Sequence, residues 1–168
     1  MDRAVIGAPR PVAIAIGSNL GDRRAAIAFA MDRLSRILSE ISYSDIVETD
    51  PEGLDGEVVA GEPLFLNAVV TGTTTLGARD LLDQLLAAER EFGRERPHPG
   101  AARTLDLDLI LLGDAVIDEP GLQVPHPRFR ARFFVLGPLA EIAPDFVDPV
   151  TGLRVGELLK RLLQDKGR

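Results

Sequence analysis

The hydrophobic and polar positions along the chain follow two different periods, which predict alternating strands and helices. Short apolar runs at 12–16 and 64–71 predict buried strands, and a further strand is expected over 43–49. Apolar residues at helical spacing predict an amphipathic helix over 78–92, which Gly93 ends. The order of these elements is strand, helix and strand, repeated once, followed by further helices.

The remaining elements are predicted from turn residues and apolar spacing. Asp22 is a good N-cap for a helix that follows the first strand. The apolar positions assigned to this helix are Ile27, Ala30, Met31, Leu34, Ile37, Leu38 and Ile41. A polar turn is expected at 72–75, a short strand at 115–117 and partial helix at 128–139. The last helix is predicted from Val155, Leu158, Leu159, Leu162 and Leu163.

The segment 103–112 alternates most clearly and is the centre of the predicted site. Read as a strand, it places four leucines on one face, namely Leu105, Leu107, Leu109 and Leu111. Asp106 and Asp108 point to the other face, which Ile110 and Leu112 continue. The acidic pair is therefore expected at the mouth of a buried core, where a binding site could lie.

Two carboxylates on one face of a strand lie about 6.5–7 Å apart. On so apolar a segment they are costly without a partner, and Mg²⁺ suits a carboxylate pair that leaves room for water and phosphate oxygens. Arg103 lies just before the pair in the sequence and is expected to bind an anion beside it. The alternative is an edge strand whose acids face solvent and discourage aggregation, and this segment alone does not decide between the two.

Other charged residues favour a site for phosphate groups. Glu89 falls in the middle of the apolar face of the helix at 78–92, where a carboxylate is expected beside a cation or metal site. The alternative is a glutamate that reaches solvent near the helix end. Six arginines crowd the same half of the chain, namely Arg94, Arg96, Arg103, Arg128, Arg130 and Arg132. Arginine suits bidentate phosphate recognition, although a simple compositional bias would also explain the cluster.

Composition narrows the class of protein. The 168 residues carry a net charge of −7, which argues against a general nucleic-acid binder. No apolar run is long enough for a membrane span or a secretory signal, and cysteine is absent, so a cytoplasmic location is expected. Nothing in the sequence demands more than a monomer, and a monomer is expected. We expect a loose, flexible leader over 1–10 and a single domain over 11–168. The predicted fold class is α+β, a ferredoxin-like α/β sandwich with a mostly antiparallel sheet and packed helices.

Five motifs together resemble a known family more specifically than any one of them does. In order they are Gly17-Ser18-Asn19-Leu20-Gly21, Phe65-Leu66-Asn67-Ala68, Gly93-Arg94-x-Arg96, Arg103-Thr104-Leu105-Asp106-Leu107-Asp108 and Val124-Pro125-His126-Pro127. Over about residues 12–160 the chain resembles the 6-hydroxymethyl-7,8-dihydropterin pyrophosphokinases of folate biosynthesis. The resemblance implies transfer of pyrophosphate from Mg-ATP to the pterin hydroxymethyl group, with release of AMP, and a ferredoxin-like fold.

The resemblance also implies roles for particular residues. Asp106 and Asp108 would bind two Mg²⁺ ions and, with Arg94 and Arg103, form the catalytic set. ATP would be held by Glu89, Arg94, Arg96, Arg103, His126 and Arg132. The pterin would be held by Thr49, Pro51, Gly53, Phe65, Asn67 and Phe134. The irregular loops at 50–63 and 94–102 would close over the substrates.

Simpler roles stay open for some of these residues. The two phenylalanines could be ordinary core residues, and His126 could be a structural histidine fixed between prolines. The chain also departs from the family pattern. Many members have Trp-Gly-Pro before the arginine of the aspartate strand, where this chain has Gly100-Ala101-Ala102, and Leu86 stands where glutamine is frequent.

These departures and simpler roles keep three other functions open. The chain could be a catalytically weakened paralogue, or a ferredoxin-like module without enzymatic activity that binds a small ligand. It could also be a Mg²⁺-dependent kinase that acts on another heterocycle.

Overall fold

The computed structural model describes residues 7–19, 21–49, 64–93 and 105–166. Its main sheet is built from β1 (Arg10–Ser18), β2 (Ser39–Tyr43), β3 (Val47–Thr49), β4 (Phe65–Thr74) and β5 (Asp106–Leu112). The helices are α1 (Arg23–Ser35), α2 (Ala78–Phe92), α3 (Phe133–Ile142) and α4 (Val155–Lys166). A second, two-stranded sheet pairs β6 (Ile117–Glu119) with β7 (Leu122–Val124). Among the residues that the structure describes, no helix is long and apolar enough to cross a membrane.

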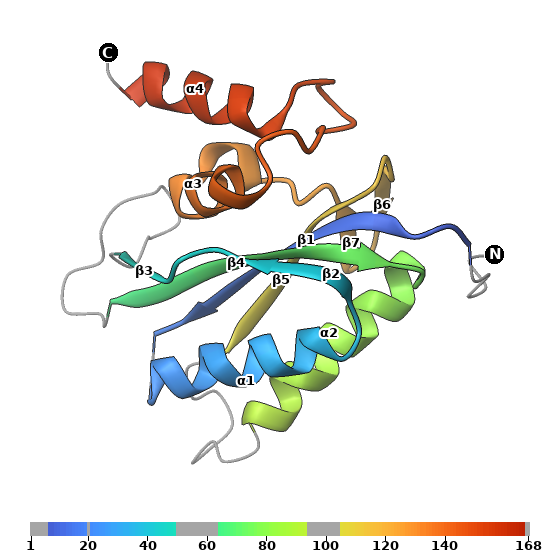
Figure 1. The fold of residues 1–168 in the computed structure, drawn as a ribbon, viewed down its shortest axis with the longest axis vertical. Helices are drawn as coiled ribbons and strands as arrows, with labels where there is room; N and C mark the ends of the chain where they lie inside the picture. Colours follow the sequence, from blue (N-terminus) through green and yellow to red (C-terminus); the bar gives the residue numbers. More distant parts are fainter. Residues whose placement is uncertain (1–6, 20, 50–63, 94–104, 167–168) are drawn as a thin grey trace.

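The main sheet has the strand order β2-β4-β1-β5, and β3 also pairs with β4. Every pairing in it is antiparallel, and β1 pairs with β4 along its whole length, from Arg10 opposite Thr74 to Ser18 opposite Leu66. Helices α1 and α2 cover one face of this sheet, and α3 and α4 lie on the other side (Figure 1). This arrangement confirms the predicted ferredoxin-like α+β fold.

Two hydrophobic cores lie on opposite faces of the sheet. The first packs Ile14 and Ile16 of β1 against α1 and α2, and the second packs Val69 and Ile110 against α3 and α4. The central strand β1 contributes side chains to both cores, because its alternate side chains point to opposite faces. The second face also carries Asp106 and Asp108 of the predicted site, on the side of β5 away from α2.

The aspartate strand departs from strict alternation at one residue. Ala13 pairs with Leu111 but Ile14 pairs with Leu109, so Ile110 is an extra residue in β5, which is a β-bulge. Leu109 and Leu112 consequently lie in the first core, while Ile110 and Leu111 lie in the second. The prediction was right for Asp106, Asp108 and Ile110, and it was wrong for Leu111 and Leu112, whose faces are exchanged.

The first predicted helix extended too far. Helix α1 begins after Asp22, whose side chain accepts a hydrogen bond from the Ala25 backbone N–H at 3.0 Å, as the N-cap prediction requires. It ends at Ser35, however, so Ile37 and Leu38 lie in the connection between α1 and β2, and Ile41 lies in β2. All three still pack in or against the first core. The apolar pattern therefore identified core residues correctly but assigned them to the wrong element.

Strand boundaries also differ from the prediction. Gly72 and Thr73 lie inside β4, not in a turn, since β4 continues to Thr74. A Cβ at Gly72 would lie 2.8 Å from the Ser39 carbonyl oxygen, so the close approach of β2 explains a glycine within a strand. The strand predicted at 43–49 is two strands, and β6 begins two residues later than predicted. The predicted helices at 78–92 and from Val155 onward are confirmed, although Leu163 is half exposed.

Candidate active site

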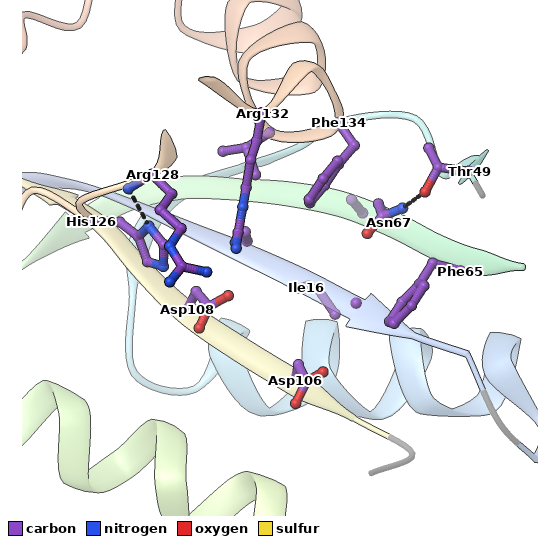
Figure 2. Close-up of a pocket in the computed structure, with 14 residues that line it drawn as sticks. Ile16, Thr49, Phe65, Asn67, Asp106, Asp108, His126, Arg128, Arg132 and Phe134 are labelled. Carbon is purple, nitrogen blue, oxygen red and sulfur yellow. Dashed lines mark hydrogen bonds between the residues drawn. The ribbon is translucent and has the colours of Figure 1, made fainter. Parts of the chain in front are cut away.

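A cavity of about 620 Å³ opens on the face of the sheet that α3 partly covers (Figure 2). Eight of the fourteen predicted site residues line it, namely Thr49, Phe65, Asn67, Asp106, Asp108, His126, Arg132 and Phe134. They come from β3, β4, β5, the segment after β7 and the start of α3. Segments distant in the sequence therefore bring the predicted residues to one place.

The two aspartates lie on β5 with their side chains on the cavity side. Asp106 pairs with Gly17 of β1 and Asp108 pairs with Ala15, so small residues form the neighbouring floor. A Cβ at Gly17 would meet the Asn67 Oδ1 atom at 3.5 Å, which shows how closely β1 approaches the polar residues of β4 here. Both aspartates are half-buried. This leaves room for ligands above the strand while limiting access of water to the carboxylates.

The donor set fits Mg²⁺ held jointly with a substrate. No cluster of three or more histidine, cysteine or acidic residues that could hold a metal occurs among the residues that the structure describes. Mg²⁺ does not need such a cage, since it is commonly bound by one or two carboxylates, water and phosphate oxygens. Asp106 and Asp108 supply two carboxylates next to open space and to basic side chains. The pair could therefore hold Mg²⁺ when phosphate oxygens complete the coordination.

One end of the cavity is lined by two aromatic rings with a polar amide side chain between them. Phe65 and Phe134 lie on opposite sides, with Asn67 between them in the view of Figure 2. The buried Asn67 donates a hydrogen bond from Nδ2 to the Thr49 Oγ1 atom at 2.6 Å. The amide is thereby held in one orientation by a neighbouring strand. The guanidinium carbon of Arg132 lies 5.6 Å from the centroid of the Phe134 ring, within the range of a cation–π contact.

His126 is fixed at the other end of the cavity by two backbone hydrogen bonds. Its own N–H donates to the Ile110 carbonyl oxygen at 2.9 Å, which attaches the segment after β7 to β5. Its Nδ1 accepts from the Arg128 backbone N–H at 3.1 Å, so the neutral ring carries its proton on Nε2.

The surroundings of His126 favour this neutral form. Burial lowers the pKa of His126 below 6.5. Asp108 opposes this shift, and the charges of Arg132 and Arg128 add to it. The ring is therefore neutral near neutral pH and offers one N–H donor, at Nε2.

A second cavity of about 710 Å³ adjoins the first. The two cavities share four lining residues, namely Asp108, His126, Arg128 and Arg132. The rest of the second cavity is formed by Leu82 of α2, Leu107 and Leu109 of β5, Pro127, and residues 118–123 of the β6–β7 hairpin. One acidic and three basic or imidazole side chains thus form the boundary between two spaces, each large enough for a small molecule.

Glu89 lies behind the aspartate strand. Its carboxylate accepts a hydrogen bond from the Leu107 backbone N–H at 2.7 Å, and the residue is half-buried. The bond holds the part of β5 between Asp106 and Asp108 against the end of α2. Glu89 thus lies next to the strand that carries Asp106 and Asp108, and its predicted roles beside a metal site and in contact with ATP stay predictions.

Some predicted residues cannot be placed, and one was missing from the predicted set. Pro51, Gly53, Arg94, Arg96 and Arg103 lie outside the described residues, as do the loops 50–63 and 94–102. Arg128 lines both cavities but was counted only as part of the arginine cluster. Its position two residues after His126, in a segment restricted by prolines on both sides of that histidine, was the available signal.

Comparison with known proteins agrees with this geometry. Residues 13–144 match the family model for 7,8-dihydro-6-hydroxymethylpterin-pyrophosphokinase (HPPK). The chain is 42% identical over 150 residues to a 2-amino-4-hydroxy-6-hydroxymethyldihydropteridine pyrophosphokinase of Pseudomonas aeruginosa, which covers 88% of this chain and 89% of that protein. It is 40% identical over 133 residues to the enzyme of the same name in Bacillus subtilis, which covers 77% of this chain and 75% of the relative.

Longer relatives and solved structures extend the comparison. The chain is 46% identical over 101 residues to the pyrophosphokinase of Synechocystis sp., which covers 60% of this chain, and it spans about half of that relative, 52%. The HPPK-DHPS of Plasmodium falciparum superposes with a TM-score of 0.73 at 13% identity, covering 96% of this chain and 47% of the other, which supports the fold alone. On the family match and the bacterial relatives, the chain belongs to the 7,8-dihydro-6-hydroxymethylpterin-pyrophosphokinase family and is a pyrophosphokinase.

Proposed function

We propose that the protein transfers the terminal pyrophosphoryl group of Mg-ATP to the hydroxymethyl oxygen of 6-hydroxymethyl-7,8-dihydropterin and releases AMP. The observation that carries this proposal is the junction of two cavities at Asp108, His126, Arg128 and Arg132. A reaction that moves a charged group between two substrates needs such a boundary, where acidic, basic and hydrogen-bonding groups meet. The family match and the bacterial relatives support the same reaction and its place in folate biosynthesis.

The first cavity suits the pterin. A flat heterocycle can stack between Phe65 and Phe134, which lie on opposite sides of the space in Figure 2. Asn67 stands between them with its Nδ2 directed to Thr49, so its Oδ1 is available to accept from an N–H on the pterin edge. These contacts would fix the ring with its hydroxymethyl group toward the aspartates. The prediction that Pro51 and Gly53 complete this end of the cavity is part of the proposal.

The second cavity suits the nucleotide, with its phosphates toward the shared boundary. His126 would donate from Nε2 to a phosphate oxygen, because its Nδ1 is already bonded to the Arg128 N–H. Arg132 lines both cavities and would bind a neighbouring phosphate. The predicted phosphate contacts of Arg94, Arg96 and Arg103, and the predicted ATP contact of Glu89, belong to the same proposal.

Catalysis would then depend on position and charge. The hydroxymethyl oxygen forms a bond to the β-phosphorus, the bond from that phosphorus to the oxygen bridging to the α-phosphate breaks, and AMP leaves with the bridging oxygen while the hydroxyl proton is released. Asp106 and Asp108 would hold two Mg²⁺ ions, which when bound neutralise phosphate charge and orient the attacking and leaving oxygens. The protein contributes the alignment, because two substrates bound in adjacent cavities have already lost the translational and rotational freedom that the reaction would otherwise cost.

The proposal is tested by measuring AMP release from Mg-ATP with and without 6-hydroxymethyl-7,8-dihydropterin. We expect AMP only when the pterin is present, together with one pterin diphosphate per AMP. Asp106→Ala and Asp108→Ala should each reduce the rate by at least about a hundredfold, because each removes half of the protein's metal ligands. Asp165→Asn, at an exposed position in α4, is the matched control and should leave the rate unchanged.

Other products would contradict the proposal. Formation of ADP would indicate transfer of a single phosphoryl group, and AMP formed equally without the pterin would indicate hydrolysis. Tight pterin binding without AMP would favour the weakened paralogue or the binding module. The cytoplasmic location and monomeric state expected from the sequence stay predictions.

A further inference from the structure

Arg128 occupies an unusual place at the boundary between the two cavities. It lines both of them, together with Asp108, His126 and Arg132. Figure 2 shows the side chains of Arg128 and Arg132 extending toward Asp108 from the side of α3. A group that passes from a ligand in one cavity to a ligand in the other would therefore move close to these side chains.

The three arginines of this segment have different surroundings. Arg130 is bound to the buried carboxylate of Asp148 through Nε at 2.5 Å and Nη2 at 2.9 Å. Arg132 lies against the Phe134 ring and so contacts the proposed pterin wall as well as the boundary. Arg128 is exposed, and among the residues that the structure describes its guanidinium forms no ion pair. Of the three, Arg128 is the one whose charge is available to a ligand without giving up a partner.

The backbone and side chain of Arg128 do different things. The backbone N–H donates to His126 Nδ1 at 3.1 Å, and any amino acid except proline would keep this bond. The guanidinium points instead toward the boundary above Asp108. A substitution of the side chain therefore removes the charge while the tautomer of His126 is preserved.

We propose that Arg128 is a further catalytic residue that binds the pyrophosphoryl group during its transfer and retains it on the pterin product. This inference rests on the function proposed above. A guanidinium reachable from both cavities can hold phosphate oxygens before the β-phosphorus leaves ATP and after it joins the pterin. A group in the nucleotide cavity alone could do only the first, and a group in the pterin cavity alone only the second.

The inference predicts that loss of the Arg128 guanidinium affects turnover and product binding but not binding of the pterin alone. Removal of a charge-assisted hydrogen bond to phosphate weakens the affected state by roughly tenfold to a hundredfold. Arg128→Gln should therefore lower kcat and weaken binding of the pterin diphosphate product by similar factors within that range. Binding of the pterin alone should change less than about twofold, because that ligand carries no phosphate for the guanidinium to contact. Arg128→Lys should restore part of the loss, since it returns the charge without the bidentate geometry.

The experiment measures kcat and KM for ATP by AMP release, and the dissociation constants of pterin and of pterin diphosphate by calorimetry. Arg161→Gln, which removes an exposed arginine on α4, is the control for the change in net charge. The inference is overturned if Arg128→Gln raises only KM for ATP, or if it weakens pterin and pterin diphosphate equally. If the unsubstituted enzyme forms no AMP, the proposed function fails and the inference fails with it. If the unsubstituted enzyme turns over normally and Arg128→Gln has the same kcat and the same affinity for pterin diphosphate, the inference is overturned while the proposed function stands.

Discussion

Asp148 offers the sharpest prediction about what holds the site in place. Its carboxylate is fully buried and accepts hydrogen bonds from the Arg130 guanidinium, the Thr151 hydroxyl at 2.8 Å and the Val150 backbone N–H at 3.0 Å. Burial alone would raise the pKa of Asp148, but these bonds and the charge of Arg130 bring the pKa below 3.8. Asp148→Asn would remove the charge and replace one acceptor oxygen with an NH₂ group that cannot accept from Arg130.

The expected loss of unfolding free energy depends on Arg130, which loses its ion-pair partner when Asp148 is replaced. Breaking a buried ion pair by removing one member costs about 3–5 kcal/mol, because the other charge stays without compensation. The side chain of Arg130 is 27% exposed, so solvent can recover part of that loss. We therefore expect Asp148→Asn to lower the free energy of unfolding by about 2–3 kcal/mol near neutral pH. Asp145→Asn, at an exposed position in the same connection, should change it by less than about 0.5 kcal/mol.

Urea unfolding at several pH values tests this reasoning. A carboxyl whose pKa is lower in the folded state stabilises the protein fully above the unfolded pKa of about 3.8. That contribution is lost progressively as pH falls through 3.8 toward the lower folded value. The stability difference between the original chain and Asp148→Asn should thus be largest near neutral pH and shrink in acid. A difference that is absent at neutral pH, or that stays constant as the pH falls below about 3, would refute the ion-pair explanation.

Three further predictions concern other links between sequence, fold and site. Gly72→Ala should lower the free energy of unfolding by about 1–3 kcal/mol in urea titration, because the added Cβ would lie 2.8 Å from the Ser39 carbonyl oxygen. Asp22→Ala should lower it by about 1 kcal/mol by the same measurement, since the N-cap bond to Ala25 is lost. Phe134→Ala should weaken pterin binding in calorimetry by at least about tenfold while affecting binding of ATP less, and equal losses for both ligands would contradict the stacking role.

The fold could be predicted from the sequence wherever one local pattern decided the structure. Helix α2 has the predicted bounds, because its apolar spacing begins after Gly77 and ends at Gly93 with no competing signal. Helix α1 was overextended because Ile37 and Leu38 keep helical spacing although the chain has already turned toward β2. Periodicity records which residues face a core, and it cannot tell whether they reach that core from a helix or from the turn after it.

The bulge in β5 shows a second limit. Asp106 and Asp108 were placed correctly on one face, because alternation holds up to Leu109. The extra residue Ile110 is specified by the pairing with β1, where Ala13 and Ile14 face Leu111 and Leu109. A run of leucine and isoleucine carries no local sign of such an irregularity, since every residue in it suits either core.

The site was predicted to the extent that its chemistry is visible in single residues. Acidic and basic groups could be named as metal and phosphate ligands, but Phe65 and Phe134 could equally have been core residues without the family resemblance. The structure places both beside a cavity, with Asn67 oriented by Thr49 from another strand. The place of Arg128 is not visible in the sequence, because lining two cavities at once is a property that exists only after the segments are assembled.

The position of the candidate active site follows from how unevenly the two faces of the sheet are covered. Helices α1 and α2 fill one face with a continuous apolar core, whereas α3 covers the other face only in part and α4 packs on α3 (Figure 1). The half-buried aspartates lie where that cover stops, which gives them open space for ligands at a tolerable cost of desolvation. Arg132 and Phe134 begin the covering helix and also line the cavity, while Val135 and Leu136 of the same turn pack in the core. Because Arg130 and Asp148 anchor the segment just before this helix, the packing of the second core also fixes where Arg132 and Phe134 enter the cavity.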